Sequence, residues 1–241
     1  MNKKELVVKY RSLVSMACSA FNCLNAFRIR KKGKNNRIDA SCALLKKVHI
    51  TIHGNNNTVT IGDFAQLSGA SITIYGDNNR VDIGPWSILN GTELHIEKNN
   101  GSITIGEHTR FLGKTHLAVL EGTALRIGKD CLFSSDIHFR TGDSHSVLDL
   151  SGRRINPSED ITVGDHVWFG TKVTCLKGAK IPAHSIVGAC ALVSGKFREP
   201  NCVLAGVPAK VVKRGVDWSI SRVPVGEVAP DFQPIGEVES L

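Results

Sequence analysis

One polar segment near the middle of the chain holds side chains suited to acid–base chemistry. Residues 134–160 read SSDIHFRTGDSHSVLDLSGRRINPSED and contain His138, Asp143, His145, Arg153 and Arg154. A hydroxyl is a poor nucleophile until a base takes its proton, and an imidazole with an ordinary pKa near ~6.5 is mostly free base at neutral pH. Because loops on rigid scaffolds commonly carry function, we expect this segment to contribute to a catalytic or binding site.

The sequence before this segment is repetitive. Four stretches begin 22 residues apart and end in the same Ile-Gly pair: HITIHGNNNTVTIG (49–62), SITIYGDNNRVDIG (71–84), ELHIEKNNGSITIG (93–106) and THLAVLEGTALRIG (115–128). A fixed period of this kind indicates structurally equivalent coils that stack on one another.

From residue 163 the period shortens to six. Large apolar residues (Val163, Phe169, Cys175, Ile181, Val187, Val193) alternate with smaller ones (Val167, Val173, Ala179, Ser185, Ala191). This pattern fits a chain that coils as a triangular prism, with the large side chain on the axis and the small one inside near a corner. It predicts an all-β fold, a parallel β-helix over residues 38–207 with an inserted, protruding loop at 134–160.

Gly- and Asn-rich corners follow the longer coils. Asn56, Asn78 and Asn100 are one period apart, so their amides are expected to stack in a hydrogen-bonded ladder with a structural role. Gly and Asn tolerate the left-handed backbone conformation that a tight corner needs.

The positive charge of the chain is concentrated at its N-terminal end. The formal net charge is +8, but residues 1–50 hold 12 Lys and Arg against Glu5 and Asp39, which leaves 18 basic and 20 acidic residues for 51–241. Apolar residues in 4–28 recur with helical period. We predict a basic amphipathic helix within residues 1–37 that lies on the body or a neighbouring subunit, with peripheral membrane contact as the alternative.

Composition excludes several classes of protein. The near-neutral body argues against nucleic-acid binding. Seven cysteines without a CxxC pair disfavour a disulfide framework and fit a reducing cytoplasm. No run reaches the ~18 apolar residues of a membrane span, and the N-terminal stripe is too interrupted for a secretion signal. Residues 208–241 lose the repeat and are predicted to form a C-terminal tail, extended over 215–241.

Four stretches of the chain resemble a known enzyme family: GDSHSV (142–147), RINP (154–157), VGDHVWFG (163–170) and LAGVPAKVVK (204–213). They look like the hexapeptide-repeat acyltransferases, whose fold is a left-handed parallel β-helix. They are most similar to the branch that O-acetylates surface polysaccharides such as capsule. The resemblance implies acetyl-CoA as co-substrate, a carbohydrate acceptor and a homotrimer.

The resemblance also implies site residues. His145 would be the general base, Asp143 would orient it or bind substrate, and Trp168 would line the acceptor and thioester site. The co-substrate would be met by Gly170 and Thr171 at the thioester, where a backbone N–H would stabilise the oxyanion, by Ala189 at the pantetheine, and by Lys196, Lys210 and Lys213 at the phosphates. Three features depart from the family pattern. Ser144 and Cys190 stand where glycine is usual, and Ser194-Gly195-Lys196 is one residue longer than the common threonine-lysine form.

A different enzyme on this fold would use other histidines. His166 and His184 are 18 residues apart, and His116 and His138 are 22 apart, so each pair is expected in one outward column. Inter-subunit histidines holding zinc would resemble a γ-class carbonic anhydrase. The acidic and amide residues that such a site needs are not recognisable, so we expect no metal.

We therefore predict direct acetyl transfer from acetyl-CoA to a hydroxyl of a bacterial surface polysaccharide or its precursor, in a ternary complex. The expected location is the cytoplasm or the inner face of the membrane. No cysteine lies in the stretch around His145, so a thiol nucleophile has no support. The alternatives are N-acetylation of an amino-sugar nucleotide and a non-catalytic β-helical binding module.

Overall fold

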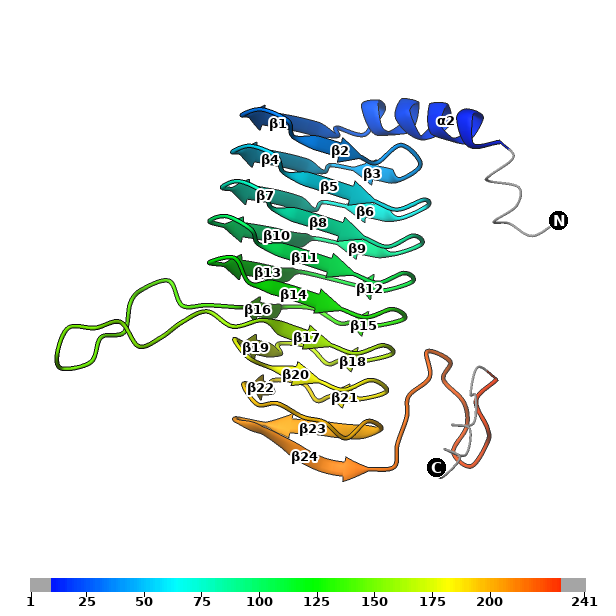
Figure 1. Cartoon of the computed structure of the whole chain (residues 1–241). Helices are drawn as coiled ribbons and strands as arrows, with labels where there is room; N and C mark the ends of the chain where they lie inside the picture. Colours follow the sequence, from blue (N-terminus) through cyan, green and yellow to red (C-terminus); the bar gives the residue numbers. More distant parts are fainter. Residues whose placement is uncertain (1–9, 231–241) are drawn as a thin grey trace, which may run out of the picture.

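The computed structural model describes residues 10–230. The chain coils into a three-sided prism whose coils stack along one axis, with a helix at one end and a long loop projecting from the side (Figure 1). The predicted all-β parallel solenoid is confirmed. No helix in the described range is long and apolar enough to cross a bilayer.

Each side of the prism is one sheet. The first face holds β1 (Arg28–Lys32), β4 (His49–His53), β7 (Ser71–Tyr75), β10 (Thr92–Glu97), β13 (Thr115–Leu120), β16 (Ile137–Arg140), β19 (Thr174–Leu176) and β22 (Leu192–Val193). The second face holds β2 (Arg37–Asp39), β5 (Thr58–Ile61), β8 (Arg80–Ile83), β11 (Ser102–Ile105), β14 (Ala124–Ile127), β17 (Ile161–Val163) and β20 (Lys180–Ile181). The third face holds β3 (Leu44–Lys46), β6 (Gln66–Ser68), β9 (Ile88–Asn90), β12 (Arg110–Phe111), β15 (Leu132–Phe133), β18 (Trp168–Phe169), β21 (Ile186–Val187), β23 (Cys202–Gly206) and β24 (Ala209–Arg214).

The repeat columns form the core. The strand register aligns the isoleucine that precedes each repeated glycine, and the hexad residues from Val163 to Val193 are buried as predicted. Phe111, Phe133 and Phe169 stack inside the third face with ring centroids 4.2 and 4.6 Å apart. Each fully buried aromatic or aliphatic side chain stabilises the fold by about 1.5–3 kcal/mol.

The asparagines at the corners form a hydrogen-bonded ladder, as predicted, although not every one of them joins it through its side-chain amide. Asn56 Nδ2 donates to Asn78 Oδ1 at 3.3 Å, whereas Asn100 joins through its backbone N–H, which donates to Asp77 O at 3.0 Å. A second ladder is buried: Asn57 Nδ2 donates to Gly76 O, and Asn57 Oδ1 accepts from the Asn79 N–H. The buried amides satisfy corner backbone groups that water cannot reach.

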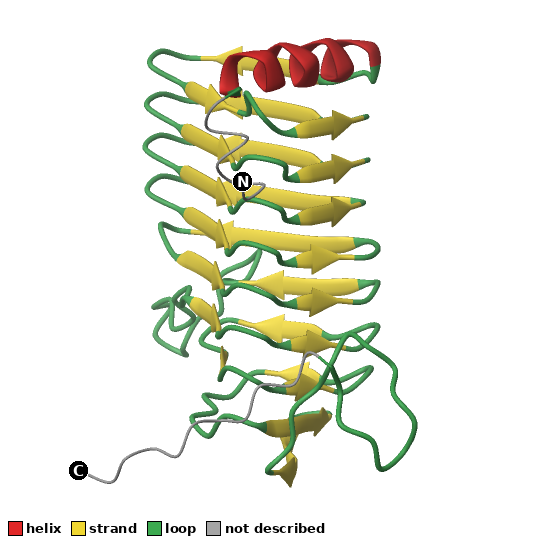
Figure 2. Cartoon of the chain, turned by 90° about the vertical axis from the view of Figure 1, so that its right-hand side faces the viewer, coloured by secondary structure: helices red, strands yellow, loops and turns green. Residues whose placement is uncertain are grey.

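The N-terminal boundary differs from the prediction. The helix α2 spans Arg11–Leu24 and lies across the open end of the prism, and β1 and β2 already belong to the first coil (Figure 2). The basic stretch Arg28–Lys32 is therefore a strand, and the solenoid begins before the predicted residue 38. Residues 1–9 of the predicted helical stretch lie outside the described range.

The loop and the C-terminal boundary also differ. Residues 137–140 form β16 within the first face, so the protrusion is residues 141–160 rather than 134–160. Residues 209–214 form β24, which pairs antiparallel with β23, and so belong to the prism rather than to the tail. Residues 215–230 contain no helix or strand and run beside the prism, and we call residues 217–220 the strap.

Candidate active site

The protruding loop is organised around one buried amide. Asn156 Nδ2 donates to the backbone carbonyl of His145 and to Asp143 Oδ2, both at 2.8 Å, and Asn156 Oδ1 accepts from the Val147 N–H at 2.8 Å. Asn156 is 7% exposed, whereas the His145 side chain is exposed. The two arms of the loop are thus joined at the backbone of the histidine, whose exposed ring can meet a partner.

No hydrogen bond or ion pair joins Asp143 to the His145 ring within residues 10–230. Among the described residues its carboxylate is bonded to Lys177 Nζ, at 2.6 Å, and to Asn156. The hydrogen bond from Lys177, together with that from Asn156, lowers the pKa of Asp143 below its ordinary value. Within one chain, Asp143 therefore fixes the root of the loop to the coil that carries Lys177, and it does not orient the imidazole.

A second ion pair anchors the other arm of the loop. Arg154 donates to both carboxylate oxygens of Glu121, at 2.5 and 2.9 Å, and Ser158 Oγ donates to Glu121 Oε2 at 2.7 Å. The hydrogen bonds from Arg154 and Ser158 lower the pKa of Glu121 to about 2. A bidentate guanidinium–carboxylate pair holds its partners in a defined orientation.

Trp168 lies on a different side of the prism from His145. It belongs to β18 on the third face and is 38% exposed, whereas the loop leaves the prism between β16 and β17 of the first and second faces (Figure 1). One chain alone therefore does not bring the predicted base and the predicted tryptophan together.

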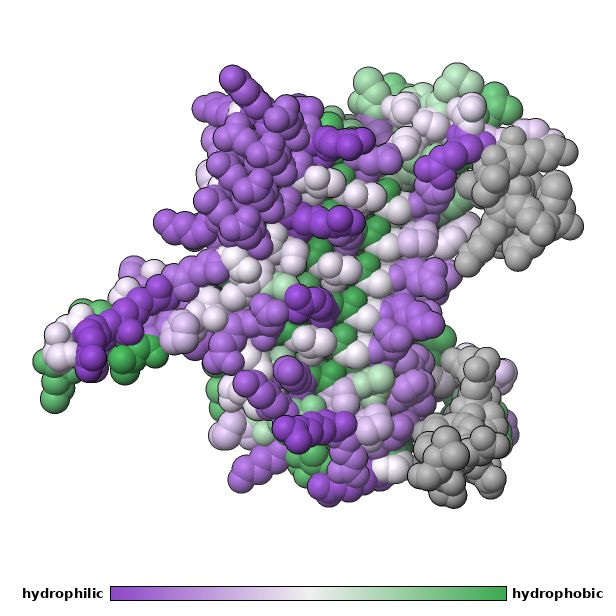
Figure 3. Space-filling model, viewed as in Figure 1, coloured by the Kyte–Doolittle hydropathy of each residue, from purple (hydrophilic) through white to green (hydrophobic). Residues whose placement is uncertain are grey.

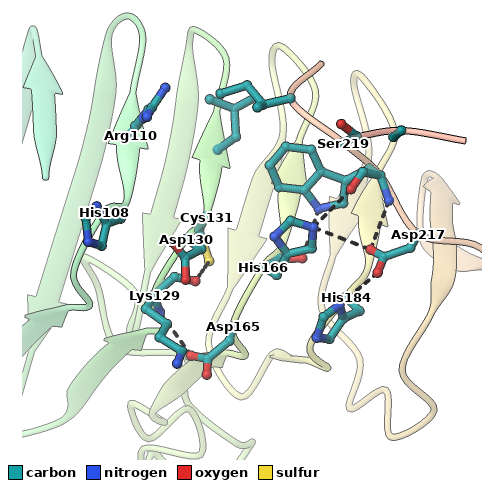
Figure 4. Close-up of a pocket in the computed structure, with 14 residues that line it drawn as sticks. His108, Arg110, Lys129, Asp130, Cys131, Asp165, His166, His184, Asp217 and Ser219 are labelled. Atoms are coloured by element: carbon teal, nitrogen blue, oxygen red, sulfur yellow. Dashed lines mark hydrogen bonds and ion pairs between the residues drawn. The ribbon is translucent and has the colours of Figure 1, made fainter. Parts of the chain in front are cut away.

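A groove of about 790 Å³ runs between the prism and the strap (Figure 4). Its lining includes Arg110, Lys129, His166, His184 and Trp218. The Trp218 ring stacks on His166 with centroids 4.4 Å apart and lies 6.2 Å from the Trp168 ring. The groove thus combines two cations with three carboxylates (Asp130, Asp165 and Asp217) and an aromatic wall next to Trp168, which suits a polar, ring-shaped ligand.

The strap is held by the predicted histidine column. The His166 and His184 rings lie next to each other, tilted by 47° with centroids 5.1 Å apart, which confirms their common column. Asp217 accepts from His184 Nδ1 at 2.9 Å, and Trp218 Nε1 donates to the His166 carbonyl at 2.9 Å. Sequence reasoning missed Asp217 and Trp218 because they lie beyond the repeat; the one available signal was a tryptophan in a chain that has three.

His166, His184 and Asp217 are also the group in the described range that could hold a metal ion, with donor atoms within 4.8 Å of one another. His166 Nε2 lies 3.0 Å from the Trp218 carbonyl and 3.5 Å from Asp217 Oδ1, and His184 Nδ1 also faces Asp217. Hydrogen bonds therefore account for the two nitrogens that face Asp217, His166 Nε2 and His184 Nδ1. The other predicted column, His116 and His138, aligns in register with centroids 6.1 Å apart.

The predicted co-substrate residues fall into two groups. Gly170, Thr171 and Ala189 follow β18 and its neighbouring coil, and a Cβ at Gly170 would lie 2.6 Å from the Ala189 nitrogen. The Gly170 N–H donates to Val187 O at 2.8 Å within the solenoid, so an oxyanion donor here would be another group. Lys196 contacts Glu159 at 3.4 Å, whereas Lys210 and Lys213 are exposed on β24.

The comparisons with known proteins point to one family. No protein-family profile matches the chain. The chain is 35% identical over 190 residues to the polysialic acid O-acetyltransferase of Neisseria meningitidis, covering 78% of this chain and 87% of that one, and 32% identical over 109 residues to the polysialic acid O-acetyltransferase of Escherichia coli O1:K1 / APEC, covering 45% and 35%. Among solved structures it is similar to the polysialic acid O-acetyltransferase OatWY (TM-score 0.78, 32% identity, 83% of this chain and 94% of that one) and to the polySia-specific acetyltransferase NeuO (TM-score 0.74, 27% identity, 84% and 92%). The chain belongs to the left-handed β-helix, hexapeptide-repeat O-acetyltransferases, in the branch that acts on polysaccharides.

Proposed function

We propose that this enzyme transfers an acetyl group from acetyl-CoA to a hydroxyl of an anionic bacterial polysaccharide, within a closed homotrimer. The observation that carries the proposal is the separation of His145 and Trp168 on different sides of one prism. An active site that needs both residues has to be completed by a second copy of the chain.

A threefold ring supplies that second copy. A contact between two different surfaces of the same chain is heterologous, and three such contacts close into a ring. Residues 141–160 project away from their own prism and expose Val147, Leu148, Leu150 and Ile155. These apolar side chains would be buried when the loop of one copy lies against the third face of the next, which places His145 beside the neighbour's Trp168.

The reaction proceeds by direct transfer. His145 takes the proton of the sugar hydroxyl as the hydroxyl oxygen attacks the thioester carbonyl, and the imidazolium returns the proton to the thiolate that leaves. The buried thiols of Cys131 and Cys175 are not suited to act as nucleophiles, because a thiolate would be needed. Burial raises the pKa of Cys131, the cysteine that lines the groove, to about 12, and burial also raises the pKa of Cys175.

The groove beside Trp168 is the acceptor site in this proposal. Trp218 would stack on the apolar face of a sugar ring, while Arg110 and Lys129 would attract acidic groups of the polymer. Relatives that are polysialic acid O-acetyltransferases support an acidic polysaccharide as the acceptor. The bound acetyl-CoA would contact Gly170, Thr171 and Ala189, with its phosphates at Lys196, Lys210 and Lys213, as the family resemblance implies.

The cytoplasm is the proposed location. All seven cysteines are free thiols, which fits a reducing compartment, and the donor acetyl-CoA is a cytoplasmic metabolite.

Complementation between two inactive variants tests the proposal. His145→Ala and Trp168→Ala would each be inactive alone, and CoA release would be measured with acetyl-CoA and an acidic polysaccharide. Co-expressed in equal amounts, the two variants should recover about a quarter of the wild-type rate, because one interface in four then pairs an intact histidine with an intact tryptophan. No recovery, or CoA release only with amino-sugar nucleotides, would contradict the proposal.

A further inference from the structure

The helix that closes the N-terminal end of the prism is attached through a polar residue. Asn22 is 6% exposed, its Nδ2 donates to Ala43 O at 3.0 Å, and its Oδ1 accepts from the Leu45 N–H at 2.8 Å. Cys18, one turn earlier, is the other buried residue of α2. Arg11 forms an ion pair with Asp63 on the body. The face of α2 that meets the solenoid thus combines polar contacts with the buried Cys18 thiol.

The opposite face of α2 is apolar and exposed. At 100° per residue, Leu13, Met16, Ala17, Ala20 and Leu24 fall on the side away from Cys18 and Asn22. Leu13, Met16 and Leu24 are 60%, 61% and 87% exposed. A cap on a solenoid normally turns a polar face to water, so this apolar face requires a partner.

The strand that follows this helix in the chain is basic. Arg28, Arg30, Lys31 and Lys32 make up most of β1, and all five of its residues are exposed. Lys31 pairs with Ile52, which is fully buried, so the apolar column ends where β1 begins. In Figure 3 hydrophilic side chains gather over the end of the prism that carries β1, and the apolar face of α2 lies at the same end.

The apolar face of α2 and the cations around β1 together indicate which kind of partner binds here. Residues 10–47 hold nine Lys and Arg (Arg11, Arg28, Arg30, Lys31, Lys32, Lys34, Arg37, Lys46, Lys47) against Asp39, so two such ends would repel each other rather than stack. A soluble polyanion would pair with the cations but leave Leu13, Met16 and Leu24 in water. An anionic bilayer offers both phosphate charge and acyl chains. The helix, about 21 Å long, is suited to lying in the interface.

We propose that the N-terminal end of the prism is a membrane-docking surface, formed by the outward face of α2 and the cations of β1, which binds the surface of a bilayer rich in anionic phospholipid. Docking through this end leaves the third face and the loop free along the side of the prism. The inference does not depend on the proposed function.

Vesicle co-sedimentation of the full chain tests the docking surface. The protein should pellet with vesicles that contain phosphatidylglycerol and not with pure phosphatidylcholine, and added salt should weaken the binding. Arg30→Ala combined with Lys32→Ala should reduce the partition coefficient roughly 25-fold, since each cation near the surface contributes about a factor of five. Leu24→Ser should reduce it at least about tenfold.

Matched variants elsewhere serve as controls. Lys180→Ala with Arg198→Ala removes two exposed cations from other coils, and Val225→Ser removes an exposed apolar residue from the C-terminal segment, so neither should change vesicle binding. Equal pelleting with neutral and anionic vesicles, or none with either, would overturn the proposal. A change of oligomeric state in Leu24→Ser without a change in vesicle binding would identify the face as a subunit contact instead. Acetylation of a soluble acceptor reports on the proposed function separately.

Discussion

Asn156 holds the backbone of His145: the buried amide donates a 2.8 Å hydrogen bond to the carbonyl of the exposed histidine, across eleven residues of the loop. The same nitrogen binds Asp143, and the amide oxygen binds Val147. The backbone of His145 is therefore held by a hydrogen bond that does not involve the imidazole. We regard Asn156 as a positioning residue.

Replacing Asn156 by Ala should lower kcat by about tenfold to hundredfold, because a small displacement of a catalytic group is costly. The KM for acetyl-CoA and the melting temperature of the prism should stay near wild type, since the loop lies outside the core. Steady-state kinetics and circular dichroism would measure these quantities. Ser151→Ala, which loses a hydrogen bond to Asp149 in the same loop, is the control and should leave kcat unchanged.

Replacing His145 by Ala should reduce kcat by about 10²–10⁴-fold with little effect on folding, since the side chain is exposed and general-base catalysis is lost. The neighbouring Ser146→Ala should retain activity. If folded His145→Ala transferred acetyl at a near wild-type rate, another group would have to be the base.

The Glu121–Arg154 pair should loosen in acid. The pKa of Glu121 in the folded chain is about 2, below its ordinary 4.5, so the ionised form is favoured and the pair stabilises the loop at pH values above 4.5. This contribution, below about 1 kcal/mol because both side chains are partly exposed, is lost as the pH falls from 4.5 towards 2.

Pepsin cleavage within residues 141–160, followed by mass spectrometry, would measure this loosening. Cleavage of the wild type should rise as the pH falls through that window. Glu121→Gln should already be cleaved readily near pH 4.5, and its extent of cleavage should change less with pH. Arg80→Gln, which breaks the ion pair with Asp82 within β8 on the second face, is a control for general destabilisation. If cleavage of Glu121→Gln depended on pH in the same way as cleavage of the wild type, the Glu121–Arg154 pair would not be the group that loosens.

Replacing Trp218 by Ala should raise the KM for the polysaccharide about fivefold, the loss expected for one aromatic contact, while the KM for acetyl-CoA stays unchanged. His184→Ala should have a smaller effect, because it removes one of the hydrogen bonds that hold the strap while those to His166 remain. Val225→Ala, farther along the same segment and fully exposed, should behave as wild type. If Trp218→Ala raised only the KM for acetyl-CoA, the co-substrate rather than the polysaccharide would bind in the groove.

Replacing Phe133 by Ala should destabilise the protein by about 3–5 kcal/mol, because Phe133 is fully buried between Phe111 and Phe169. Urea unfolding followed by circular dichroism would measure the change. Leu112→Ala, at a position that is 56% exposed, should cost less than about 0.5 kcal/mol.

The solenoid could be predicted because its information is local and repeated. Ile83 and Ile105 occupy equivalent places in successive coils, so each copy of the pattern reinforces the next. The strand β1 could not be found in this way. Arg28–Lys32 has no apolar alternation, and its strand conformation comes from pairing with β4, which is a tertiary contact.

The site was predictable only in part. The motif around His145 identified the loop, but the binding of Asp143 to Lys177 depends on a contact between residues 34 apart that no local pattern encodes. The same is true of Trp218, whose partner His166 lies 52 residues away. In the proposed trimer Trp168 meets His145 of the partner subunit, and a single sequence does not specify the geometry of that contact.

Stacked parallel strands leave open edges at both ends of the stack, and such edges can pair with another chain and grow into fibrils. The two ends of this prism each have a feature that opposes such pairing. At the C-terminal end β24 runs antiparallel to β23, so the ladder stops and a further parallel coil cannot be added in register. At the other end, the lysines and arginines of β1 repel an incoming copy. Both features limit the growth of the stack of coils. The cations that we assign to a bilayer thus also oppose the association of this edge with another copy.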